Sequence, residues 1–139
     1  LCSGQSNMER QVGDRPGQMP LPDADQEIAA ANFPQVRLFK VEKQKLASPG
    51  KDVEAAWEVC SPESLRQSEF SAVGYFFGRK LHRETGVPVG LIDATWGGTR
   101  IEPWTPPEAF APMPSLAAFA VAAQAPAGKA GDCVAGVLY

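Results

Sequence analysis

The residues best suited to chemistry lie at the start of the chain, where a glycine-flanked serine follows two apolar residues. Leu1 and Cys2 are typical of the end of a buried strand, and Ser6 comes two residues after Gly4. Gly4 permits a sharp turn, and a helix after Ser6 would direct backbone N–H groups at an anion. The pattern favours Ser6 as an exposed nucleophile, with a helix-capping serine as the alternative. The α/β-hydrolase elbow is not indicated, because Met8 stands where that motif has glycine.

A second block, residues 94–104 (ATWGGTRIEPW), contains a pair of glycines after an apolar stretch. Acyl transfer needs a nucleophile, a base that takes its proton, and donors for the oxyanion. Gly97 and Gly98 suit the donor role because no Cβ would keep the substrate away from their backbone N–H groups. The alternative is a plain loop after a strand.

The side chains around the glycine pair are suited to binding a sugar. Trp96 and Trp104 could stack on sugar rings or simply pack the loop. Arg100 could pair with a carboxylate. Glu102 is expected to hydrogen-bond the loop, and Gln5, beside the serine, is assigned to the same substrate-binding group.

Residues 4–8 (GQSNM) and 94–104 together resemble the sialate O-acetylesterase family, carbohydrate esterases of the SGNH hydrolase superfamily. Residues 70–79 and 86–92 look like the helix and strand that precede the second motif there. The resemblance implies hydrolysis of O-acetyl esters on sialic acid or another acetylated glycan, through an acetyl-serine intermediate on Ser6. It also implies oxyanion donors at Ser6, Gly97 and Gly98, and no metal or organic cofactor.

The general base is the part of this machinery that the sequence lacks. His82 is the one histidine, and it lies about 180° around a helix from Val73, which indicates a solvated surface residue. In the family, the catalytic His and Asp come from a later Asp-x-x-His motif, and Asp132 is not followed by such a histidine. We therefore expect residues 1–139 to be the N-terminal part of a single esterase domain and to be inactive alone. The alternative is a non-catalytic or degenerate glycan-binding domain of the same fold.

The elements that must position these residues follow from local patterns. Residues 71–85 form the clearest helix, capped by Ser71, ended by Gly86, with Val73, Phe76, Phe77 and Leu81 on one face. The continuous apolar run at 87–92 predicts a buried parallel strand, and Asp93 at its end is interpreted as a loop-orienting carboxylate. The other expected elements are the strand end at 1–2, a helical turn after Ser6, a loop at 13–25, a strand at 36–41, a turn at 43–52, an edge strand at 57–59, a helix at 116–124, a flexible segment at 125–132 and the start of an element at 134–139.

Helix, glycine turn, buried strand and glycine loop together predict an α/β protein. The resemblance makes this a three-layer α/β/α (flavodoxin-like) fold with a parallel sheet, incomplete in this chain. Sites in such folds lie at the carboxyl ends of strands. Because both motifs follow a strand, we expect them to converge on one edge of the sheet.

Composition excludes other classes of function. The 139 residues are 44% hydrophobic and 21% charged with a net charge of −3, without a basic patch, so nucleic acid is not an expected partner. No apolar run approaches the roughly 20 residues of a membrane span. Cys2, Cys60 and Cys133 lack metal-type spacing and are expected to be buried, with a disulfide left open. The chain shows no signal peptide and is expected to lack its true N-terminus; the family resemblance implies a periplasmic or extracellular location.

Overall fold

The computed structural model divides the chain into two units: Leu1–Val41 with Ala55–Gly97, and Glu42–Glu54 with Gly98–Tyr139. The structure describes residues 1–46, 52–101, 104, 105, 109, 112, 115 and 133–135, with the backbone alone for 45, 46 and 133–135. Each unit is described by itself.

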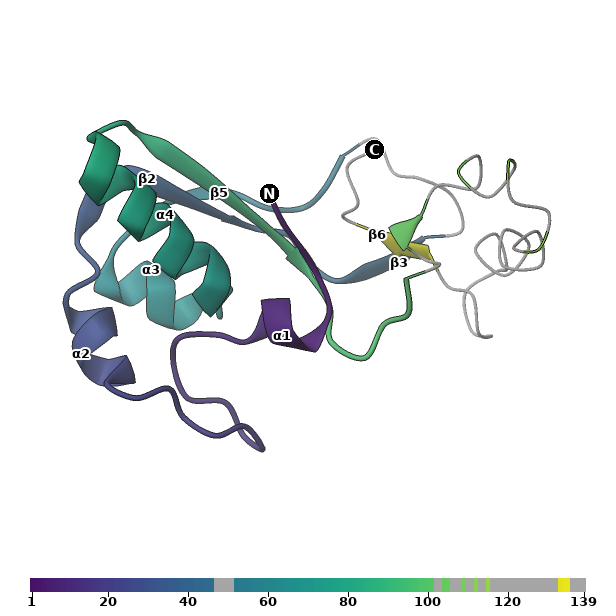
Figure 1. The fold of residues 1–139 in the computed structure, drawn as a ribbon, viewed down its shortest axis with the longest axis horizontal. Coiled ribbons are helices and arrows are strands. Elements are labelled where there is room, and N and C mark those ends of the chain that lie inside the picture. Colours follow the sequence, from purple (N-terminus) through teal and green to yellow (C-terminus); the bar gives the residue numbers. More distant parts are fainter. Residues whose placement is uncertain are drawn as a thin grey trace. The chain divides into compact units, whose positions relative to one another are not determined.

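The first unit is built on a four-stranded sheet with the strand order β1-β5-β2-β4. The first three of these strands are parallel, and β4 pairs antiparallel with β2 at one edge. Gly4 is the register partner of Thr95, so the loops after β1 and β5 leave the sheet side by side (Figure 1). The two motifs therefore begin side by side at one edge of the sheet, as expected. The strands are β1 (Cys2–Gly4), β2 (Phe33–Lys40), β4 (Trp57–Cys60) and β5 (Val89–Thr95).

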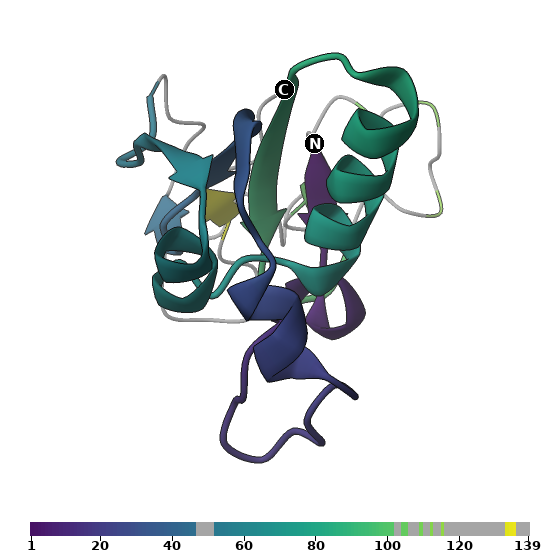
Figure 2. The same ribbon diagram turned by 90° about the vertical axis from the view of Figure 1, so that its left-hand side faces the viewer.

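Helices cover one face of this sheet. Val36, Leu38 and Leu91 belong to a core that also contains residues of α2, α3 and α4. Figure 2 shows these helices beside the sheet. The fold is therefore α/β with a mixed sheet, and the second helical layer of the predicted three-layer fold is not among the described residues. The helices are α1 (Ser6–Glu9), α2 (Ala24–Ala29), α3 (Pro62–Gln67) and α4 (Ala72–Thr85).

The longest helix, α4, has the ends that the sequence predicted. The Ser71 hydroxyl accepts a hydrogen bond from the backbone N–H of Gly74 at 3.2 Å, which caps the first turn. Gly86 follows the last turn with a φ of +70°, a left-handed conformation that suits glycine. Local capping chemistry therefore determines where α4 begins and ends.

The face of α4 that packs on the sheet is not the predicted one. Val73 is 50% exposed and Phe77 is 65% exposed, whereas small residues and Tyr75 are buried. A methyl group on Gly78 would overlap the side chain of Leu91 in β5. The glycine thus lets α4 approach β5 closely at this point, where a side chain would collide with Leu91.

Other boundaries differ from expectation because short elements depend on their neighbours. The strand predicted at 36–41 begins at Phe33, so Pro34 lies inside β2, where the register is irregular between Phe33 and Arg37. The strand predicted at 87–92 is shifted to Val89–Thr95. The edge position of β4 and the helical turn after Ser6 are confirmed.

Three short elements were not predicted. Helix α2 overlaps the end of the expected loop at 13–25, and α3 follows Ser61, whose hydroxyl accepts from the Ser64 backbone N–H at 3.1 Å. In the second unit, β3 (Gln44–Leu46), within the predicted turn, pairs antiparallel with β6 (Cys133–Ala135). The predictions for residues 116–124 and 125–132 lie outside the described residues. Across the described part of the chain, no helix has the length and apolar character to cross a bilayer.

Candidate active site

Ser6 is an exposed residue at the first position of α1, two residues beyond β1. Gly4 makes the turn into this helix with a φ of +136°, and a methyl group there would lie 3.1 Å from Met8 Cγ. The carbonyl of Gln5 accepts hydrogen bonds from the backbone N–H groups of Met8 and Glu9, both at 2.9 Å. The sharp turn expected of Gly4 is therefore present, and it leaves Ser6 open to solvent.

The loop after β5 brings Gly97 beside Ser6. The backbone N–H of Trp96 donates to the carbonyl of Gly4 at 2.9 Å, which ties this loop to the end of β1. A methyl group on Gly97 would lie 3.6 Å from the Ser6 Cα, so the two backbones are close neighbours. Gly98 follows with a φ of +77° and belongs to the second unit.

A buried carboxylate, missed in the sequence analysis, lies next to this pair. Glu9 is 6% exposed, and its Oε2 accepts a hydrogen bond from Arg15 Nη1 at 3.1 Å. A methyl group on Gly97 would overlap that same oxygen. Glu9 lies three residues after Ser6, on a neighbouring position of α1, but this spacing does not indicate that Glu9 is buried.

Asp93 organises the start of α4 rather than the loop after β5. The side chain is fully buried. Its Oδ2 accepts from Lys40 Nζ at 2.7 Å and from the Ser71 backbone N–H at 2.8 Å. Its Oδ1 accepts from the Thr95 hydroxyl at 2.6 Å. The prediction of a loop-orienting carboxylate is therefore wrong in its target: Asp93 links β2, the start of α4 and β5.

His82 lies at the opposite end of the sheet from Ser6. Its Nδ1 is 2.8 Å from the carbonyl oxygen of Val87, just before β5 begins, and its ring meets Phe33 edge to face with centroids 6.4 Å apart. Ser6 follows the carboxyl end of β1, which runs parallel to β5. His82 is therefore not the base for Ser6. It is also half-buried rather than fully solvated, because its ring packs on Phe33.

The two cysteines whose side chains are described are structural. Cys2 and Cys60 are free and buried, as expected. Burial raises the pKa of the Cys60 thiol to about 11, and burial likewise raises the pKa of Cys2. Both thiols stay protonated at neutral pH, so neither is a candidate nucleophile.

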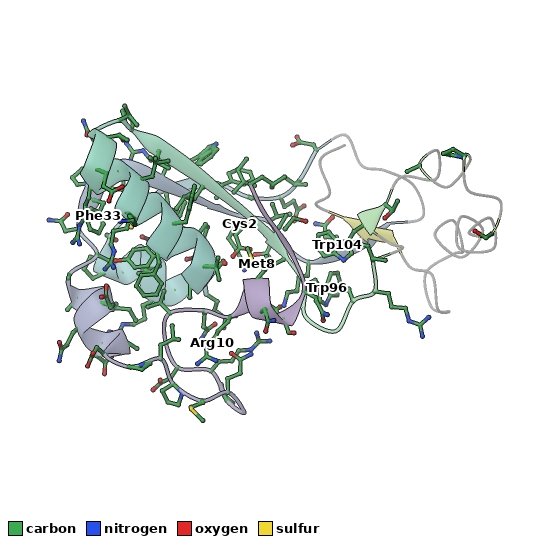
Figure 3. The ribbon with its side chains drawn as sticks, in the orientation of Figure 1. Cys2, Met8, Arg10, Phe33, Trp96 and Trp104 are labelled. Atoms are coloured by element: carbon green, nitrogen blue, oxygen red, sulfur yellow. The ribbon has the colours of Figure 1, made fainter. Side chains whose placement is uncertain are left out.

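The structure describes four of the five predicted substrate-binding residues: Gln5, Trp96, Arg100 and Trp104. Gln5 is exposed, and Trp96 and Trp104 are half-buried on the segment that follows β5 (Figure 3). Trp104 Nε1 donates to the Thr99 hydroxyl at 2.8 Å, so this indole is held within its own loop. Arg100 is exposed.

The second unit contains Arg100 and Trp104, and Glu102 lies outside the described residues. Within the described ranges, no three His, Cys, Asp or Glu side chains gather as a metal-ion site requires.

Comparison with known proteins gives consistent relatives. The family described as carbohydrate esterase, sialic acid-specific acetylesterase, matches residues 1–139. The sialate O-acetylesterases of Homo sapiens and Mus musculus are 35% and 33% identical over 112 residues, which cover 76% of this chain and 20% of each relative. A crystal structure of a carbohydrate acetylesterase from Xanthomonas citri is 38% identical with a TM-score of 0.67, covering 78% of this chain and 23% of that one. The chain thus spans about a fifth of the curated relatives it matches.

Proposed function

Because the chain belongs to the carbohydrate esterase family of sialic acid-specific acetylesterases, we propose that it supplies the nucleophile and part of the oxyanion hole of a carbohydrate O-acetylesterase. One observation carries this proposal. Gly97, in the loop after β5, and Ser6, at the start of α1 just beyond β1, have their backbones side by side at the carboxyl ends of two adjacent parallel strands. A nucleophile with backbone N–H groups beside it is the arrangement that acyl transfer requires.

In the proposed reaction, Ser6 Oγ attacks the carbonyl carbon of an acetyl ester on the sugar. Negative charge develops on the carbonyl oxygen. This oxygen accepts hydrogen bonds from the backbone N–H groups of Ser6 and of Gly97 or Gly98. The bond to the sugar oxygen breaks, the sugar oxygen takes up the proton that the base removed from Ser6 and leaves as an alcohol, and an acetyl-serine remains. Water then attacks this ester, releases acetate and restores the serine hydroxyl.

The proton of Ser6 needs a base, because a serine hydroxyl alone is a weak nucleophile near neutral pH. His82 is excluded by its place at the other end of the sheet. The proposal therefore assigns the base to a histidine, oriented by an aspartate, in the Asp-x-x-His motif that the family carries further along the chain. Residues 1–139 are then the N-terminal part of one esterase domain and have little activity alone.

The substrate of this reaction is an acetylated glycan, a sialic acid among the candidates. Trp96 and Trp104 offer aromatic faces for a sugar ring, and Arg100 offers a charge for a carboxylate. Gln5, exposed beside Ser6, and Glu102 complete the proposed contacts. The family resemblance implies a periplasmic or extracellular location, which fractionation of the native host would test.

A second candidate is a glycan-binding domain that retains this fold without catalysis. One observation favours it: His82, the one histidine of the sequence, lies at the other end of the sheet from Ser6. The two candidates differ in whether acetate is released, since both would bind the glycan.

The test is acetate release by the full-length protein, meaning the longest natural chain that contains these 139 residues. Ser6→Ala should lower kcat by several orders of magnitude while glycan binding survives. Ser3→Ala, at an exposed serine of β1, is the matched control and should retain activity. Glycan binding without acetate release by the unmutated protein would favour the second candidate. Aryl acetate hydrolysis by the 139-residue chain that disappears in Ser6→Ala would refute the assignment of the base to a later segment.

A further inference from the structure

Glu9 places a charge in the interior of the first unit, beside the proposed oxyanion hole. The residue is 6% exposed and ends α1. A buried carboxylate costs free energy unless a counter-charge compensates it. Arg15 does so at 3.1 Å from Oε2, with its own side chain 33% exposed. Because an apolar side chain would often serve stability equally well at such a position, stability alone does not account for the ion pair.

The carboxylate of Glu9 occupies the space that a side chain at position 97 would need. A methyl group on Gly97 would overlap Oε2 and lie 3.4 Å from Cδ, and it would lie 3.6 Å from the Ser6 Cα. The same side of Gly97 therefore faces both the backbone of Ser6 and the carboxylate of Glu9. The size and position of that carboxylate limit how closely the loop after β5 can approach α1.

We infer that Glu9 is a positioning residue whose carboxylate, held by Arg15, sets the spacing between the backbones of Gly97 and Ser6. The inference rests on the proposed function, in which these backbones bind the oxyanion. Oxyanion holes act through donors that are fixed before the reaction. A misplacement on the order of 1 Å can lower the rate by about 10²-fold, so the spacing that Glu9 sets would govern kcat.

The first experiment measures kcat and KM for acetate release by the full-length protein with Glu9 changed. Glu9→Ala should lower kcat by about 10-fold or more while KM changes much less, because the oxyanion forms only in the transition state. Glu9→Gln keeps the side-chain volume and an oxygen that can accept a hydrogen bond from Arg15. It should therefore retain most of the kcat of the unmutated protein. Glu84→Gln, which breaks the exposed pair with Lys80, is the matched control and should leave both constants unchanged.

The second experiment combines Glu9→Ala with Gly97→Ala. The methyl group of Gly97→Ala meets the Glu9 carboxylate only when that carboxylate is present. Gly97→Ala should therefore lower kcat by a smaller factor in the Glu9→Ala background than in the unmutated protein. Titration of the reactive serine with an acylating inhibitor corrects each kcat for the fraction of folded enzyme.

The outcomes distinguish a failure of the role assigned to Glu9 from a failure of the proposed function. An unchanged kcat in Glu9→Ala, with activity abolished in Ser6→Ala, would overturn the role of Glu9 and leave the proposed function intact. Losses that multiply in the double variant, or a kcat restored fully once corrected for folded enzyme, would also overturn it. Activity that survives in Ser6→Ala would refute the proposed function, and the role of Glu9 with it.

Discussion

Gly97→Ala tests whether the loop after β5 is part of the catalytic site or only a connection. The added methyl group would overlap Glu9 Oε2, a buried oxygen that Arg15 holds in place, and it would lie 3.6 Å from the Ser6 Cα. The overlap requires a shift of either the Glu9 side chain, which is 6% exposed and paired with Arg15, or the loop after β5. A shift of the loop would carry the backbone N–H of Gly97 away from Ser6.

The size of the effect follows from the proposed role of that N–H. Loss of one oxyanion donor lowers kcat by about 10²-fold or more, which corresponds to about 3 kcal/mol of transition-state stabilisation. Gly98→Ala provides a comparison within the same loop. Nothing lies within 4 Å of a methyl group there, but the φ of +77° costs a non-glycine residue about 1–2 kcal/mol. We therefore expect Gly97→Ala to affect kcat and Gly98→Ala to affect mainly stability.

The assay is kcat for acetate release beside thermal unfolding, on the full-length protein and both variants. Gly97→Ala should lose far more in kcat than its change in Tm accounts for. An unchanged kcat in Gly97→Ala would remove Gly97 from the site. A loss of activity that merely parallels the loss of folded protein would mean that Gly97 serves packing, and the reasoning from its contact with Glu9 would be wrong.

The other predictions concern the scaffold. Asp93→Ala removes the partner of Lys40 Nζ and of the Ser71 N–H, and it should lower the free energy of unfolding by about 3 kcal/mol or more in urea titrations; a loss below about 1 kcal/mol would contradict the buried ion pair. Tyr75→Ala should destabilise by about 3–5 kcal/mol, and Phe77→Ala by about 0.5 kcal/mol, because Tyr75 is buried and Phe77 is 65% exposed. Equal losses in thermal unfolding would show that the face of α4 assigned to the core is wrong.

Secondary structure was predictable where its signals are local. The ends of α4 follow from Ser71 and Gly86, whose side-chain and backbone chemistry acts within a few residues. The face that α4 buries was not predictable in this way. The apolar periodicity predicted that Val73 and Phe77 lie on the buried face. In the structure, Gly78 lies on that face, because the absence of a side chain there permits close contact with β5.

The sequence motifs predicted the part of the candidate site that contains Ser6 and Gly97. Ser6 and Gly97 come from separate loops, and the parallel pairing of β1 with β5 brings them together as the motif order indicated. Arg100 and Trp104 lie in the second unit, and their roles stay predictions. Glu9 was missed because a single acidic residue in a short helix looks like a solvated one until its burial is known.

The sequence by itself determined the two family motifs, the strands that lead into these motifs and the capped helix α4. These features depend on residue types and on neighbours along the chain. The tertiary structure alone decided which carboxylates are buried and what they hold. Glu9 meets Gly97, and Asp93 meets Lys40 and Ser71, across long separations in sequence. The physical reason is that the cost of burying a charge depends on the partners that the fold brings to it, and no local pattern encodes those partners.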